Sequence, residues 1–209
     1  AMIVIAHEPK PNFTQLDSYL LACHHLKLAP LILINKVDLW QDSTENFFNS
    51  IIQRYKNLGY SVNKVSIFCQ ESLEALKTEI KGKISVFVGQ SGVGKTSLIN
   101  ALVPKAHLAV GEISQLVKLG SHTTSQSQLL HSPFGGDIID SPGIRDFVLW
   151  PMNITEITQG FPDIAAYAKF CKFRNCTHQH EPWCAVLQAL NKNKINHERL
   201  NSFHQLLER

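Results

Sequence analysis

Short apolar runs alternate with amphipathic segments along the first 150 residues. The runs are rich in Ile, Leu and Val and predict strands; they lie at 3–6, 31–34, 62–66, 84–88, 129–131 and 137–139. Between them, apolar residues at helical spacing predict helices at 14–26, 42–57, 72–80 and 95–102. Thr14 is the expected N-cap of the first helix. This alternation favours an α/β fold with a mostly parallel sheet.

The pattern changes near residue 150. Residues 103–127 show little periodicity and contain many Ser, Thr and Gly, which is typical of a functional or disordered loop. After residue 150 no strand is predicted, and residues 195–207 predict a terminal helix. We therefore expect one domain over residues 1–150 and a smaller helical domain over residues 151–209.

The amino-acid composition constrains the class of protein only broadly. The 209 residues are 44% hydrophobic and 18% charged, which is ordinary for a soluble protein. No apolar run approaches the roughly 18 residues that span a bilayer, and no signal peptide is recognised, so we expect a cytoplasmic protein. Because the chain begins within a predicted strand, we also expect an upstream domain to be missing.

The net charge of +3 is unevenly distributed. Residues 169–209 contain seven lysines and arginines against three acids. A basic segment of this kind is typical of a protein that contacts a polyanion, and it is equally typical of a solvated surface.

A phosphate-binding motif follows the run at 84–88. Residues 89–96 read Gly-Gln-Ser-Gly-Val-Gly-Lys-Thr and match G-x-x-x-x-G-K-[ST] between a predicted strand and a predicted helix. Lys95 would neutralise the β- and γ-phosphates, and Thr96 would ligate Mg²⁺. The residues expected to surround the phosphates are Gly89, Gln90, Ser91, Gly92, Val93, Gly94, Lys95, Thr96 and Ser97.

A guanine-binding motif, N-K-x-D, follows the run at 31–34. Asp38 can accept hydrogen bonds from guanine N1–H and its exocyclic amine, and adenine offers neither donor. Asn35 would support the loop, and the Lys36 stem would cover the base. Ser66 lies where a further base-contacting loop is expected, although the residues after it match poorly. The guanine motif precedes the phosphate motif, which reverses the usual order in GTPases.

Residues 140–143 read Asp-Ser-Pro-Gly and supply the D-x-x-G element. Asp140 would reach Mg²⁺ through water, and the Gly143 N–H would contact the γ-phosphate, so that loss of this phosphate releases the segment. Either Thr123 or Thr124 is a candidate for a second threonine ligand of Mg²⁺.

The residue after Gly143 is Ile144, where many GTPases have a glutamine that positions water. We therefore expect slow intrinsic turnover and a partner or another group that completes the site. His122 is the catalytic candidate, with an ordinary loop histidine as the alternative, and Arg145 is a second candidate.

Three of the five cysteines lie close together in the sequence with a histidine among them. Their spacing, C-x4-C-x-H-x5-C, supplies a complete tetrahedral set for structural Zn²⁺; the ligands would be Cys171, Cys176, His178 and Cys184. Buried free cysteines beside an unrelated histidine are the alternative, and His180 could replace His178. Cys23 and Cys69 are expected in the core.

Together these motifs resemble the circularly permuted bacterial GTPases called ribosome small-subunit-dependent GTPase A. The resemblance covers nearly the whole chain, and the combination of permuted order with the zinc set makes it specific. It implies a P-loop NTPase fold, a circularly permuted Ras-like GTPase with a C-terminal zinc-binding domain, preceded in such proteins by an OB-fold. Ser121 stands where a basic residue is usual before His122.

The resemblance further implies a monomeric GTP hydrolase that binds Mg²⁺ with GTP or GDP, contacts the small (30S) ribosomal subunit and its rRNA late in assembly, and is stimulated by that subunit. The competing interpretation is an rRNA-docking scaffold in which GTP is a ligand and turnover is incidental. A metabolic P-loop kinase is a more distant alternative, because Asp38 disfavours adenine.

Overall fold

The structure is a computed structural model that describes residues 1–108, 128–140 and 149–208. The chain divides into two compact units. The first contains residues 1–11 and 30–146, and the second contains residues 12–29 and 147–209. Within the described ranges, no helix combines the length and apolar character needed to cross a bilayer.

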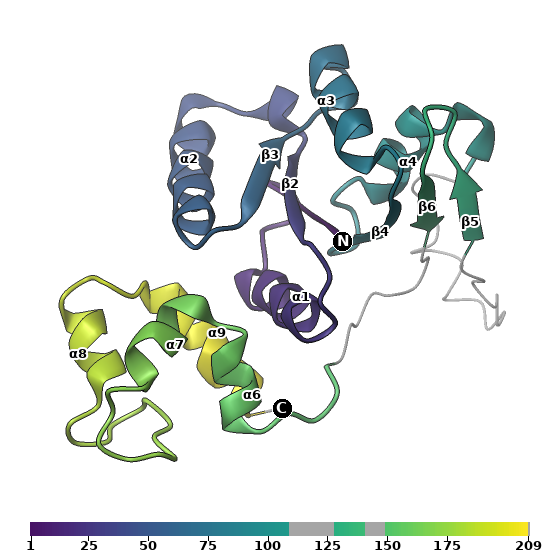
Figure 1. The fold of residues 1–209 in the computed structure, drawn as a ribbon. Coiled ribbons are helices and arrows are strands. Elements are labelled where there is room, and N and C mark those ends of the chain that lie inside the picture. Colours follow the sequence, from purple (N-terminus) through teal and green to yellow (C-terminus); the bar gives the residue numbers. More distant parts are fainter. Residues whose placement is uncertain (109–127, 141–148, 209) are drawn as a thin grey trace, which may run out of the picture. The chain divides into compact units, whose positions relative to one another are not determined.

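The first unit is built on a six-stranded sheet formed by the described residues, in the order β3-β2-β1-β4-β6-β5 (Figure 1). All neighbouring strands are parallel except β5, which runs antiparallel to β6. This confirms the prediction of a mostly parallel sheet. The strands are β1 (Met2–Ala6), β2 (Leu31–Asn35), β3 (Ser61–Lys64), β4 (Ile84–Val88), β5 (Gln128–His131) and β6 (Asp137–Asp140).

The central strands β1 and β2 are buried on both faces, which explains why they are continuously apolar rather than alternating. On one face, Val4 and Leu33 share a core with apolar residues of two helices, such as Leu76 and Leu98. Full burial of a side chain of this size contributes roughly 1.5–3 kcal/mol. The helices of this unit are α2 (Asp42–Asn57), α3 (Gln70–Ile80) and α4 (Lys95–Leu102), with short 3₁₀ turns at Val37–Leu39 and Pro104–Ala106.

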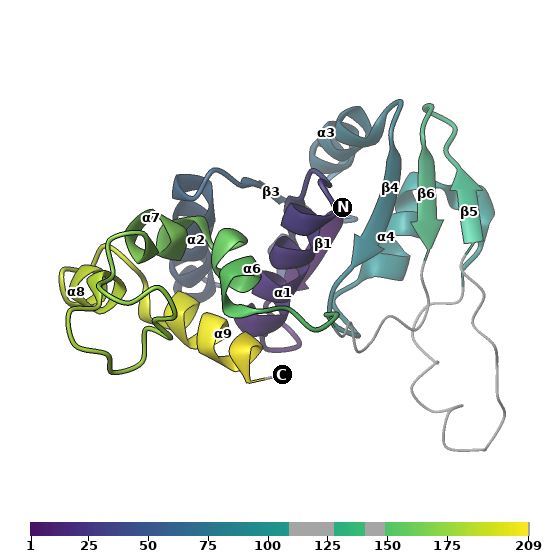
Figure 2. The same cartoon turned by 60° about the horizontal axis from the view of Figure 1, so that its bottom comes forward.

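The second unit is helical, and its first helix comes from the N-terminal part of the chain. Helix α1 lies against α9, which ends near the C-terminus (Figures 1 and 2). A capping box between Asn153 and Glu156 begins α6. The helices are α1 (Phe13–His25), α6 (Ile154–Gln159), α7 (Pro162–Ala168), α8 (Ala185–Asn191) and α9 (His197–Leu207).

A buried arginine joins three helices of this unit. Arg199 of α9 is 1% exposed, and its guanidinium donates to both carboxylate oxygens of Asp163 on α7, at 3.1 and 2.9 Å. It also donates to Asp17 of α1 at 2.5 Å and lies 4.4 Å from the ring centroid of Phe161. The planar guanidinium suits this combination of a bidentate carboxylate and an aromatic face. The arginine therefore fixes α1 to the C-terminal helices.

Two local predictions were wrong, and one predicted helix end differs by a single residue. Asn12, not Thr14, caps α1 by accepting a hydrogen bond from the Gln15 N–H at 3.0 Å, and the Thr14 hydroxyl instead donates to Gln205 of α9. Cys23 is buried as expected, but Cys69 precedes α3 and is exposed. The first helix ends at His25, and Leu26 beyond it is 55% exposed.

Arg199→Ala should destabilise the second unit by about 3–5 kcal/mol, because it leaves the carboxylates of Asp17 and Asp163 buried without their cation. Urea unfolding of the variant measures this loss. Lys194→Ala, an exposed residue of the same unit, serves as the matched control and should change stability by less than about 0.5 kcal/mol. Equal stabilities of the two variants would show that the arginine does not hold the helices together.

Candidate functional site

The carboxyl ends of the parallel strands bring the sequence motifs to one edge of the sheet. The next strand along the chain after β1 is β2, which lies on one side of β1 in the sheet. The later strands β4, β6 and β5 lie on the other side of β1. Ligands of open α/β sheets bind at such a reversal of strand order. The segments that leave this edge are residues 7–11 after β1, 35–38 after β2, 89–94 after β4 and the end of β6 at Asp140.

The phosphate motif forms the turn between β4 and α4. Gly89 has a φ of 143°, and a Cβ at this position would collide with the carbonyl oxygen of Val4. Gly94 has a φ of 93° and immediately precedes α4. The Lys95 ammonium donates to the carbonyl oxygens of Gly89 and Gln90, both at 2.7 Å. The loop thus places a cation at the N-terminus of a helix, as phosphate binding requires.

The guanine motif is attached directly to this loop. Asn35, the last residue of β2, is 3% exposed, and its amide donates to the carbonyl oxygen of Val93 at 2.9 Å. Lys36 has a left-handed φ of 62°, and its ammonium donates to the Gly92 carbonyl oxygen at 2.8 Å. A Cβ on Gly94 would collide with the Asn35 amide nitrogen. The two motifs therefore form one continuous structure.

Ser66 lies beside Asp38, although the sequence around it is a poor match to a base-contacting loop. Its hydroxyl donates to the Asp38 carboxylate, and the Phe68 N–H donates to the same hydroxyl oxygen at 3.1 Å. The Ser66 N–H in turn donates to the Ser72 hydroxyl at 3.2 Å. A carboxylate has about four lone-pair positions, so this contact orients the exposed Asp38 and leaves acceptor positions for a base.

The segment after β1 also reaches the site, and no motif predicted it. The Glu8 carbonyl oxygen accepts from the Lys36 ammonium at 2.9 Å, and the Lys10 carbonyl oxygen accepts from the Gln90 side chain at 3.3 Å. Only topology could have indicated this contact, because residues 7–11 leave the same sheet edge as the two motifs.

Asp140 is the last residue of β6. The parallel register pairs Ile84 with Asp137 and therefore places Asp140 level with Phe87, two residues before the phosphate loop. The remaining predicted residues of this site lie outside the described ranges; these are His122, Thr123, Thr124, Gly143, Ile144 and Arg145.

A second cluster of chemically active side chains lies in the helical unit. The ligand atoms of three cysteines and one histidine all lie within 4.8 Å of one another. The sulfur of Cys171 is 3.8 Å from that of Cys184, and the His178 Nδ1 is 3.7 and 3.4 Å from these two sulfurs. Tetrahedral zinc with Zn–S bonds of about 2.3 Å requires sulfurs about 3.8 Å apart. The cluster contains Cys171, Cys176, His178 and Cys184, and it does not include His180.

Burial sets the chemistry of these ligands. It raises the pKa of the Cys176 thiol to about 12, and the neighbouring thiols add to this effect. Burial also raises the pKa of Cys184 and lowers that of His178. The buried imidazole is therefore held neutral, as a metal ligand must be, and a divalent cation would stabilise the thiolates that burial disfavours. The residues fit a structural metal.

Glu181 shapes the loop between the ligands. One of its carboxylate oxygens accepts from the N–H and hydroxyl of Thr177, both at 2.5 Å. The other accepts from the N–H groups of Gln179 and His180, at 3.0 and 3.2 Å. Partial burial opposes ionisation, but these hydrogen bonds lower the pKa of Glu181 to about 2. The ionised carboxylate thus holds the backbone on both sides of His178.

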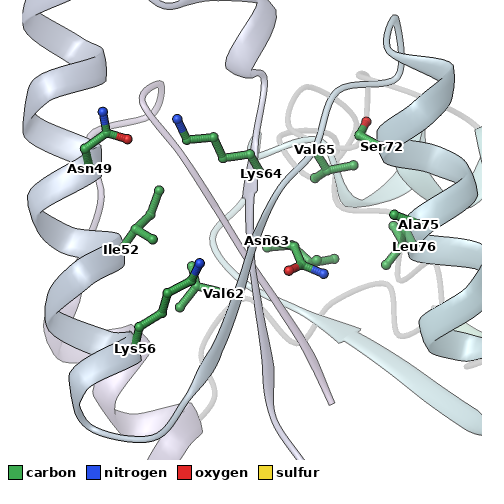
Figure 3. A pocket seen from close by; sticks show the side chains of 11 residues that line it. Asn49, Ile52, Lys56, Val62, Asn63, Lys64, Val65, Ser72, Ala75 and Leu76 are labelled. Carbon is green, nitrogen blue, oxygen red and sulfur yellow. The ribbon is translucent and has the colours of Figure 1, made fainter.

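A groove of about 470 Å³ follows β3 between α2 and α3 (Figure 3). Apolar residues such as Val62 and Leu76 line it, with Lys56 and Lys64 among its polar side chains. No residue of the phosphate or guanine motifs lines this groove, so it is separate from the site at the carboxyl edge.

Known proteins resemble this chain in sequence and in fold. A family model described as RsgA GTPase matches residues 1–150. The chain is 43% identical over 209 residues to the small ribosomal subunit biogenesis GTPase RsgA of Photorhabdus laumondii, and 42% identical to that of Yersinia enterocolitica. These matches cover 99% of the chain and 60% of each relative, so the chain spans about 60% of the length of the curated relatives that it matches.

Two solved structures share the fold. YjeQ from Thermotoga maritima matches with a TM-score of 0.81 and 30% identity, over 100% of this chain and 71% of that one. YloQ, described as a circularly permuted GTPase, matches with a TM-score of 0.77 and 30% identity, over 99% of this chain and 66% of that one. The α/β class and the permuted GTPase fold predicted from the motif order are confirmed.

Gly94→Ala should weaken guanine nucleotide binding by about 10- to 100-fold, because it combines backbone strain with a collision at Asn35. Gly59→Ala is the matched control, since Gly59 has a similar φ of 88° but open space around it. Both variants should lose stability, and only the first should lose affinity in a titration with a fluorescent GDP analogue. Unchanged affinity of Gly94→Ala would contradict the coupling of the two motifs.

Glu181→Gln should lower zinc affinity by about 10- to 100-fold, the usual effect of losing a group that orients metal ligands. Competition with a chromogenic chelator measures the affinity. Glu208→Gln, an exposed residue of the same unit, should leave it unchanged. If the two variants released zinc equally, the loop around His178 would not depend on Glu181.

Proposed function

Since the chain belongs to the RsgA GTPase family, we propose that it is a Mg²⁺-dependent GTP hydrolase that acts in late maturation of the small ribosomal subunit. The name of its curated relatives supports this assignment. The contact between the Asn35 amide and the Val93 carbonyl oxygen carries the nucleotide part of the proposal, because it joins the residues proposed to bind the base to those proposed to bind the phosphates.

Guanine selection would rest on Asp38. Its carboxylate accepts from the N1–H and exocyclic amine of guanine, whereas adenine would leave it desolvated without donors, at a cost of about 1–3 kcal/mol. Ser66 holds this carboxylate in place. The Lys36 ammonium is held by two carbonyl oxygens, which leaves its stem to lie against the base.

The phosphates would lie on the backbone N–H groups of residues 89–97, with Lys95 moving from its two carbonyl partners to the β- and γ-phosphates. Thr96, in the first turn of α4, and Asp140, at the end of β6, would hold Mg²⁺, together with Thr123 or Thr124. When bound, Mg²⁺ neutralises charge that develops on the phosphates during transfer.

Hydrolysis would depend on residues outside the nucleotide cradle. The N–H of Gly143 would contact the γ-phosphate, and the aliphatic Ile144 cannot orient water. We assign His122 as the catalytic candidate and Arg145 as a second one. A slow intrinsic rate that a ribosomal partner raises is the expected behaviour of such a site.

The cysteine–histidine cluster would hold one structural Zn²⁺. Thiolates and imidazole favour zinc over hard cations, and four protein ligands leave no open position for catalysis. The zinc would stabilise a C-terminal domain over residues 151–209, following a GTPase domain over 1–150. In the structure, helix α1 lies within residues 1–150 of the sequence but belongs to the same compact unit as the C-terminal helices.

The partners would be GTP or GDP and the small ribosomal subunit with its rRNA, bound by a cytoplasmic monomer. The basic segment 169–209 supports a polyanionic partner. Ile144 also supports a second function, an rRNA-docking scaffold in which GTP is only a ligand. Multiple turnover of GTP would distinguish the hydrolase from the scaffold.

Purified small ribosomal subunits should raise the multiple-turnover rate of GTP hydrolysis by this chain at least about tenfold, because the partner completes the catalytic site. Release of inorganic phosphate measures the rate, and Asp38→Asn should abolish the stimulated turnover at low GTP concentration. A rate that subunits leave unchanged would contradict the ribosome-dependent enzyme and favour the scaffold.

A further inference from the structure

The surface around the metal cluster exposes three large aromatic rings. Phe170 is 68% exposed, Phe173 is 41% exposed and Trp183 is 69% exposed. All three belong to the same compact unit and flank the metal-ligating cysteines in the sequence. Large aromatic side chains usually pack in the core, so a group of exposed rings indicates a binding surface.

Lysines lie against these rings. The Lys169 ammonium is 5.1 Å from the ring centroid of Phe170. The Lys172 ammonium is 5.7 Å from that of Phe173 and 5.9 Å from that of Trp183, so one cation joins two of the rings. These distances are within the range of cation–π contacts. Lys172 thus groups Phe173 with Trp183, and the Lys169–Phe170 pair adjoins this group in the sequence. We call these residues the aromatic–lysine patch (Phe170, Phe173, Trp183, Lys169 and Lys172).

Two further features belong to this patch. Trp183 has a φ of 65°, a backbone conformation that bulky residues rarely adopt and that persists mainly at functional sites. A hollow of about 260 Å³ adjoins the patch at Phe173 and Lys169, and Arg174 and the metal-cluster residues Cys176 and His178 also line it.

We propose that the aromatic–lysine patch binds unpaired nucleotides of RNA by stacking bases on the rings and neutralising the adjacent phosphates with the lysines. Aromatic side chains interleaved with cations are the usual means of binding single strands, because every base has a face that stacks. An A-form duplex exposes its backbone and minor groove rather than base faces. A protein partner fits less well, because lysine is depleted from the centres of protein interfaces.

This inference deepens the proposed function, since it shares the RNA partner, but it concerns the metal-binding unit and not the nucleotide site. A distinguishing experiment measures RNA and GDP binding on the same zinc-loaded chain. The probes are a labelled ten-nucleotide oligouridylate, an RNA duplex of ten base pairs and inorganic polyphosphate. Loss of GDP binding alone would count against the proposed function and would leave the patch intact.

Trp183→Gly removes a ring without removing charge, and its φ of 65° suits glycine, so the fold and zinc content should be retained. We expect it to weaken oligouridylate binding about 5- to 100-fold with an unchanged salt dependence. Phe170→Ala should act in the same way. Lys172→Gln should instead reduce the slope of log affinity against log salt by about 0.7, the value for one contact with a single-stranded phosphate.

Phe47→Ala, an exposed aromatic of α2, is the matched control and should bind oligouridylate like the unmodified chain. The proposal is overturned if Trp183→Gly and Phe170→Ala retain full affinity. It is also overturned if the oligouridylate, the duplex and polyphosphate bind equally well, because that result would show attraction by charge alone.

Discussion

One hydrogen bond organises the proposed nucleotide site: the Asn35 amide donates to the Val93 carbonyl oxygen, across 58 positions of the sequence. It requires Asn35 to end a buried strand and Gly94 to lack a side chain, since a Cβ there would occupy the position of the amide. The guanine and phosphate motifs are therefore joined by contact in space. Their order along the chain does not matter for the site, which explains how a permuted sequence retains a GTPase fold.

A second constraint assigns α1 to the helical unit. Arg199 is buried with carboxylates from α1 and α7, and such a charge is stable only while all its partners remain in place. The chain enters α1 directly from residues 7–11, whose carbonyl oxygens contact the Lys36 and Gln90 side chains. Within a few residues, the backbone thus leads from the proposed nucleotide site into the unit that contains the cysteine–histidine cluster.

Strong local patterns predicted much of this structure. The apolar runs located the strands because parallel strands are buried on both faces, and the phosphate motif located its loop because its glycines have a steric role. Weaker sequence patterns gave wrong or no predictions where tertiary contacts decide the local structure. Asn12 and Thr14 are both good caps, and only the contact of Thr14 with α9 separates them. The 7–11 segment has no motif, and α6, α7 and α8 are too short for clear periodicity.

We propose that the permuted motifs form one site specific for guanine nucleotides. The most direct test is the affinity of the chain for Mg²⁺·GTP compared with Mg²⁺·ATP, measured by calorimetry. We expect GTP to bind about 5- to 150-fold more tightly, the factor that corresponds to about 1–3 kcal/mol, because adenine leaves the Asp38 carboxylate without donors. Equal affinities would show instead that the phosphate-binding loop holds nucleotides without the guanine motif.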